Sequence, residues 1–122
     1  MKFRELFENK ADWKKSITSN KDHKKIVKEL EAYAKGNKYN IEKEYISDLG
    51  TALTTHIEND DLSVSVHSWY NDGDEGVYPK DYSSDNKYPL EFQVEIDFAD
   101  GEFEVREYDN AKDVIKFIQD MI

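Results

Sequence analysis

Residues 90–98 alternate without error between apolar and polar side chains, and this run constrains the fold more than any other feature of the chain. The apolar members are Leu90, Phe92, Val94, Ile96 and Phe98. A period of two predicts a β-strand with one buried face and one face in water. Because a lone strand cannot bury its apolar side, the chain must build an antiparallel sheet with one covered face.

A return strand is predicted over residues 103–108, because Asp100-Gly101 is typical of a two-residue hairpin turn. The register that follows from this turn has four cross-strand pairs: Phe98 with Phe103, Asp97 with Glu104, Ile96 with Val105, and Glu95 with Arg106. Phe103 and Val105 would then join the buried face.

A second hairpin is predicted upstream. Residues 62–70 alternate almost as regularly as residues 90–98, and the polar turn 58–61 separates them from a strand over 51–57. Residues 41–57 permit two interpretations. Ile41, Tyr45 and Leu49 have helical spacing, whereas the threonines after Gly50 favour a strand. We expect a short helix that ends near Gly50.

Helices are predicted at both ends of the chain. The clearest covers residues 21–35, with Ser19 or Asn20 as N-cap and Gly36 as the left-handed residue after the last turn. Residues 3–17 are loosely helical, and a final helix begins at Asp109 or Asn110. The chain is therefore predicted to be a single α+β domain over residues 1–122, with N-terminal helices, a four-stranded antiparallel sheet of two hairpins, and a C-terminal helix packed on one face.

Composition excludes several classes of function. The chain has 27 Asp and Glu against 17 Lys and Arg, a net charge of −10, and no cysteine. An acidic chain without a basic patch is unsuited to direct contact with nucleic acid or anionic membranes, and the missing cysteines exclude disulfides and thiolate metal sites. The start lacks the apolar run of a signal peptide, and no segment has the length of a membrane span, so we expect a cytoplasmic protein.

The acidity is concentrated in the second half of the chain, because residues 1–60 carry a net charge of +1 and residues 61–122 carry −11. In the predicted hairpin the polar face collects five carboxylates, relieved only by Arg106: Glu91, Glu95, Asp97, Glu102 and Glu104. Like charges opposite each other destabilise a sheet. Such a face either only keeps the protein solvated or binds a basic partner, and carboxylates could alternatively hold a divalent cation.

The segment 71–87 has the composition of a long surface loop in which tyrosines alternate with acidic residues. Its candidate contact residues are Asp72, Asp74, Glu75, Tyr78, Asp81, Tyr82 and Asp85. The loop departs from the EF-hand pattern, counted from Asp72, at Gly76, Val77 and Ser83. We therefore predict no metal and no cofactor.

Catalytic motifs are absent from the sequence. Ser65 and His67 could join an Asp in a triad on paper, but no nucleophile elbow or phosphate-binding glycine loop accompanies them. In size and charge the chain resembles small acidic inhibitors such as phage-encoded anti-defence proteins, anti-CRISPR proteins included, and toxin-immunity proteins. The prediction is a non-enzymatic module that occupies a basic, nucleic-acid-binding surface of a partner, for example a nuclease. The alternatives are a small enzyme or ligand-binding domain with a pocket near His67, and a homo-oligomer that pairs sheet edges or N-terminal helices.

Overall fold

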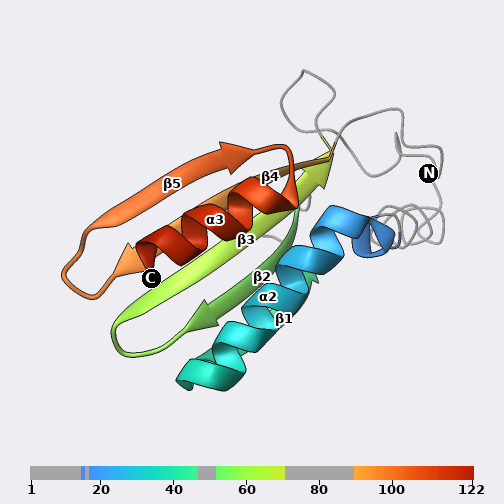
Figure 1. Ribbon diagram of the computed structural model, residues 1–122. Helices are drawn as coiled ribbons and strands as arrows, with labels where there is room; N and C mark the ends of the chain where they lie inside the picture. The colour runs from blue at the N-terminus through green and yellow to red at the C-terminus, as the bar shows by residue number, and fades with distance from the viewer. Residues whose placement is uncertain (1–14, 16, 47–51, 71–89) are drawn as a thin grey trace, which may run out of the picture.

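The computed structural model describes residues 15, 17–46, 52–70 and 90–122. In chain order the elements are α2 (Lys21–Asn37), β1 (Asn40–Ile46), β2 (Leu53–Glu58), β3 (Leu62–Tyr70), β4 (Leu90–Phe98), β5 (Phe103–Tyr108) and α3 (Ala111–Met121). The five strands form one antiparallel sheet in the order β1-β2-β3-β4-β5, and α2 and α3 lie side by side on one face of it (Figure 1). We call this the inner face and the opposite one the outer face. The predicted α+β class is confirmed, but the sheet has five strands and not four.

Both helices begin at an asparagine cap, as predicted. The side-chain oxygen of Asn20 accepts the main-chain N–H of His23 at 3.0 Å, and Asn110 caps α3 through Asp113. The predicted end of α2 at Gly36 is wrong by two residues, because the left-handed residue is Lys38, with φ 58°. Neither helix of the described chain is long and apolar enough to cross a membrane.

The predicted helix over residues 41–50 is wrong where the structure describes it, because Asn40–Ile46 forms the edge strand β1. A β-bulge explains the misleading pattern. Glu42 pairs with His56 and Tyr45 with Thr54, so β1 holds one residue more than β2 between these pairs. The extra residue places Ile41 on the inner face and Tyr45 on the outer face although four residues separate them, so β1 lacks the regular alternation by which a strand is recognised.

The predicted register between β4 and β5 is wrong by one residue. Gly101 has φ 93° and donates its N–H to the carbonyl of Phe98 at 3.0 Å, while Phe98 donates its own N–H to Glu102 at 2.8 Å. These bonds close a three-residue loop, Ala99-Asp100-Gly101, and not a two-residue turn. Asp97 therefore faces Phe103, and Glu95 faces Val105.

A shift of one residue moves every β5 side chain to the other face of the sheet. Phe103 and Val105 lie on the outer face, and Phe103 is 65% exposed. Glu104, Arg106 and Tyr108 lie on the inner side. There the Tyr108 ring centroid is 5.9 Å from that of Phe117 in α3, and the Arg106 guanidinium carbon lies 5.7 Å from the Phe117 centroid.

The core lies between the inner face and the two helices. Most of its fully buried side chains come from β2, β3 and β4 on one side and from α2 and α3 on the other: Leu53, Ile57, Val64, Val66, Phe92, Val94, Ile96, Ile26, Leu30, Val114 and Ile118. Ile17, which precedes α2, is fully buried as well. The alternation that predicted strands β3 and β4 therefore places the apolar side chains as expected.

Two phenylalanine substitutions test this register. Phe92→Ala should lower the free energy of unfolding by about 3–5 kcal/mol because it empties a fully buried site. Phe103→Ala, at the exposed position, should change it by less than about 0.5 kcal/mol. Urea unfolding of both variants at the same low protein concentration measures the difference, and equal losses would contradict the register.

Candidate partner-binding face

Alternate residues of all five strands make up the outer face, and of the helices that the structure describes both lie on the other side (Figure 1). From the strand register, the outer residues are Asn40, Glu42 and Tyr45 in β1; Thr54, His56 and Glu58 in β2; Ser63, Ser65, His67 and Trp69 in β3; Glu91, Gln93, Glu95 and Asp97 in β4; and Phe103, Val105 and Glu107 in β5. Most of these side chains are polar and at least partly exposed. Neither described helix therefore covers the outer face (Figure 1).

Negative charge dominates the strands that form this face. Residues 52–70 and 90–110 contain eleven Asp and Glu, and Arg106 is their single Lys or Arg. The exposed lysines of α2 lie on the opposite side of the sheet, at positions 21, 24, 25, 28 and 35. Charge is thus separated across the sheet, with the helix layer carrying the lysines.

Three of the predicted contact residues lie together on this face. Glu91, Glu95 and Asp97 follow one another along the outer side of β4, with Gln93 between the first two. Among the ion pairs formed within the described residues, none involves these three carboxylates. They remain available to an external cation.

The other two predicted strand residues are placed differently. Glu104 lies on the inner side, where its Oε2 is 2.8 Å from Nη2 of Arg106, so the predicted clash between Asp97 and Glu104 does not occur. Glu102 is exposed and precedes β5, with the same alternation as Glu104. The seven candidate residues between Asp72 and Asp85 lie outside the described residues.

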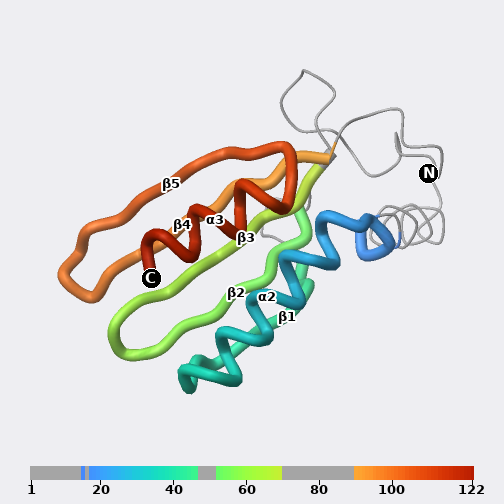
Figure 2. The backbone as a smooth tube through the Cα atoms, in the orientation of Figure 1, coloured from blue at the N-terminus to red at the C-terminus, as the bar shows by residue number. Residues whose placement is uncertain are grey.

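A second group of carboxylates lies at one end of the sheet, and sequence reasoning predicted only Glu102 among them. The β2–β3 and β4–β5 turns meet there, joined by a hydrogen bond of 2.9 Å from the Ala99 N–H to the Asp61 carbonyl (Figure 2). Asp60, Asp61, Asp100 and Glu102 are all exposed in these turns. They are far apart in sequence, and only the pairing of β3 with β4 brings them together.

Histidines of the outer face bond across β2 and β3. Thr54 Oγ1 and His67 Nδ1 are 2.7 Å apart, His56 Nδ1 and Ser65 Oγ are 2.6 Å apart, and His56 Nε2 lies 3.5 Å from Glu58 Oε2. Burial lowers the pKa of His67, an effect that the charge of Glu95 opposes and that of His56 reinforces. The Ser65–His67 pair considered for a triad is therefore not formed, since each residue bonds to β2.

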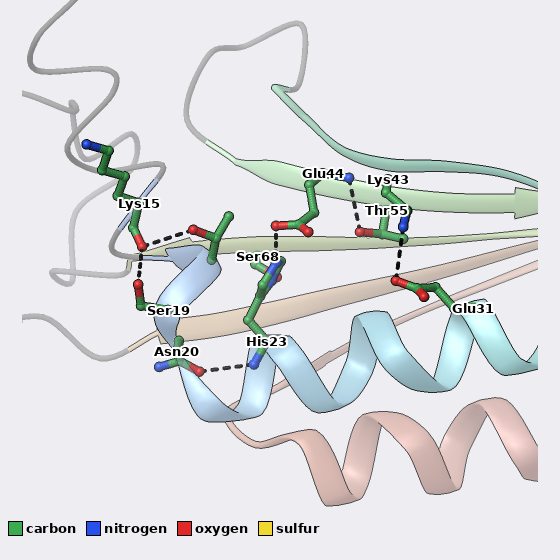
Figure 3. Close-up of polar contacts among 10 residues, drawn as sticks. Lys15, Ser19, Asn20, His23, Glu31, Lys43, Glu44, Thr55 and Ser68 are labelled. Atoms are coloured by element: carbon green, nitrogen blue, oxygen red, sulfur yellow. Dashed lines mark hydrogen bonds and ion pairs between the residues drawn. The ribbon is translucent and has the colours of Figure 1, made fainter.

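His23 forms a polar contact that the sequence did not reveal. Its Nδ1 lies 2.9 Å from Ser68 Oγ and its Nε2 lies 3.2 Å from Glu44 Oε2 (Figure 3). Glu44 belongs to the β1 bulge and has φ 53°. The available clue was that His23 continues the buried stripe of Ile26 and Leu30 along α2.

This Ser68–His23–Glu44 row has the composition of a catalytic triad but not its accessibility. His23 is 2% exposed and Ser68 is 1% exposed, so a substrate cannot reach the hydroxyl. Burial lowers the pKa of His23, and the hydrogen bond and charge of Glu44 partly oppose this shift. The row is a buried polar network that ties α2 to β1 and β3.

No group of three or more His, Asp or Glu side chains gathers as metal ligands within residues 15, 17–46, 52–70 and 90–122. Comparison with protein-family models, curated proteins and solved structures found no match. The outer face is therefore the feature of the described chain that bears most directly on function.

The His23 network predicts a pH-dependent stability. Because the folded protein favours neutral His23, the unfolded chain binds the proton more readily, and the free energy of unfolding should fall as pH drops from about 7 to about 5. His23→Gln should weaken this dependence. Glu44→Gln should strengthen it, because protonated His23 then loses its counter-charge. Urea unfolding at several pH values measures both, and a dependence that is the same in all three proteins contradicts the assignment.

Proposed function

We propose that this protein is a small, acidic, non-enzymatic binding module that occupies a basic, nucleic-acid-binding surface of another protein, as an inhibitor, immunity or anti-defence protein would. The observation that carries the proposal is the row of Glu91, Glu95 and Asp97 on the outer side of β4, which no ion pair of the described chain neutralises. A basic groove built to receive phosphates attracts such a row.

Spacing favours mimicry of a nucleic-acid strand. Side chains on one face of a strand repeat at ~7 Å, which is of the order of the distance between neighbouring phosphates along a backbone. Glu95 and Asp97 are one such repeat apart, and Glu91 is two repeats from Glu95 because Gln93 lies between them. Asp97 is also near the acidic turns, where Asp60, Asp61 and Asp100 continue the negative surface around the end of the sheet. The acidic surface is therefore longer than the row on β4.

An apolar contact lies beside these charges. Phe103 is directly opposite Asp97, and Val105 is opposite Glu95, because of the three-residue turn. Binding surfaces combine buried aromatic anchors with flanking charges, whereas a face that serves only for solvation does not need an exposed phenylalanine. The partner surface that fits best has an apolar side chain flanked by lysines or arginines.

Within the described residues, the surroundings of Ser65 lack catalytic geometry, which supports the non-enzymatic part of the proposal. Ser65 lies in the middle of β3, which pairs with β2 on one side and with β4 on the other. The N–H groups around Ser65 are therefore used in strand pairing and cannot stabilise an oxyanion. The proposal involves no cofactor and no direct contact with nucleic acid, and it retains the tyrosine-acid segment 71–87 as a predicted part of the interface.

Two matched variants test the proposal. The outer-face variant E91Q/E95Q/D97N and the helix variant D22N/E31Q/D120N remove the same charge, but only the first alters the outer face. With a binding protein isolated from the native host at low salt, the outer-face variant should bind about tenfold more weakly, because three charge pairs of about 0.5 kcal/mol each are lost. The helix variant should bind within about twofold of wild type.

Salt and competition provide the deciding measurements. Wild-type affinity should fall between about 0.05 and 0.5 M NaCl, and double-stranded DNA should displace the protein from its partner. Affinity that is insensitive to salt, or equal losses in the two variants, would overturn the proposal. Isothermal titration calorimetry provides the affinities.

A further inference from the structure

β5 is an edge strand whose free side is regular. Within the described residues it pairs with β4 alone, and it lies at the border of the sheet (Figure 1). The other edge strand, β1, is interrupted by its bulge, with Glu44 in the left-handed conformation. Bulges protect an edge from pairing with another chain, so β5 is the edge that can accept a further strand.

The hairpin hydrogen bonds determine which main-chain groups of β5 point to this free side. Phe98 donates its N–H to Glu102, which makes 98–102 a hydrogen-bonded pair. Hydrogen-bonded and non-hydrogen-bonded pairs alternate in an antiparallel ladder. Glu104 and Arg106 therefore bond to β4, and the N–H and C=O groups of Phe103, Val105 and Glu107 point outward.

We propose that a second copy of this chain binds this edge, with the two β5 strands antiparallel about a twofold axis at Val105. Outward-facing groups must meet outward-facing groups, which requires a residue of β5 on the axis. An axis at Glu104 or at Arg106 would place two like charges opposite each other. An axis at Val105 instead places Glu104 opposite Arg106 of the second copy and Arg106 opposite its Glu104.

The side chains on both faces of the junction agree with this register. On the inner side, Glu104 and Arg106 of one chain are 2.8 Å apart. In the dimer the same pair of the second copy lies beside them, so that each carboxylate faces a guanidinium of the other chain. On the outer side, Val105 faces its own copy and Phe103 is its diagonal neighbour, within reach of an aromatic ring. The exposed surface of Phe103 would thus gain an apolar contact.

Net charge opposes this assembly and gives it a distinctive salt dependence. Two chains of −10 repel each other, and at about 0.5 M salt the screening length shortens to a few ångströms, so dimerisation should strengthen as salt rises. Binding of a basic partner should weaken over the same range. The proposed dimer does not depend on the proposed function. The two can be tested separately, because added salt should strengthen dimerisation and weaken binding of a basic partner.

Two charge variants that pair only with each other test the interface. E104R carries two arginines on the inner side of β5 and R106E carries two glutamates, so each faces like charges in its own dimer. At about 0.5 M NaCl, sedimentation equilibrium should show dimers of the wild type, and each variant alone should dimerise about tenfold more weakly. An equimolar mixture should recover wild-type affinity. The intrachain pair stays broken in the mixture, so recovery reports contacts between chains.

A cysteine variant tests the position of the axis. The chain has no cysteine, so V105C should cross-link to itself under mild oxidation if two copies of residue 105 face each other. K25C, at an exposed position of α2, is the control that should stay uncross-linked. A wild-type chain that stays monomeric up to about 0.1 mM in high salt overturns the inference. A mixture that does not recover affinity, or equal cross-linking of V105C and K25C, overturns it as well.

Discussion

Burial of the inner faces of β3 and β4 under α2 and α3 is the constraint on which the rest of the molecule depends. The central apolar side chains of these strands are fully buried, and because strand residues alternate, the intervening side chains must point to the other face. Those side chains are two serines, a histidine and a tryptophan in β3 and mostly carboxylates in β4. The same packing therefore builds the core and collects negative charge on the uncovered side of the sheet.

Two local irregularities then decide which side chain lies on which face. Gly101, in a left-handed conformation, lengthens the β4–β5 loop by one residue, which turns Phe103 outward and places both Glu104 and Arg106 on the inner side. The β1 bulge adds one residue before Tyr45 and brings Glu44 to His23. Each irregularity inserts one extra residue. Because the side chains of a strand alternate with a period of two, the residues that follow it change faces and the charge of each face changes with them.

The outer face and the β5 edge share Phe103 and Val105, but they obey different electrostatics. We expect binding at the outer face to be favoured at low salt, because its carboxylates attract opposite charge. The edge is locally balanced, since Glu104 and Arg106 complement each other about an axis at Val105, while the total charge of the chain opposes self-association. A dimer formed through this edge would join two acidic sheets and enlarge the surface offered to a basic partner.

Local patterns were sufficient to predict both described helices and the strands from β2 to β5. Asn20 and Asn110 mark helix starts by their capping chemistry, and the alternation over residues 90–98 predicts both the strand and the exposure of Glu91, Glu95 and Asp97. Caps and alternation act between near neighbours in the chain, so they are readable without the fold.

Only the tertiary structure decided the fifth strand, the register of β5 and the burial of His23. β1 has no buried side chain, so its strand conformation depends on hydrogen bonds to β2 and not on its own pattern. The β5 register depends on one extra loop residue, which the Asp100-Gly101 dipeptide alone does not reveal. The sequence by itself therefore determined the two described helices, the strands from β2 to β5 and the acidic character of the polar side of β4. The fold decided the fifth strand and which carboxylates remain unpaired, because pairing depends on residues that only folding brings together.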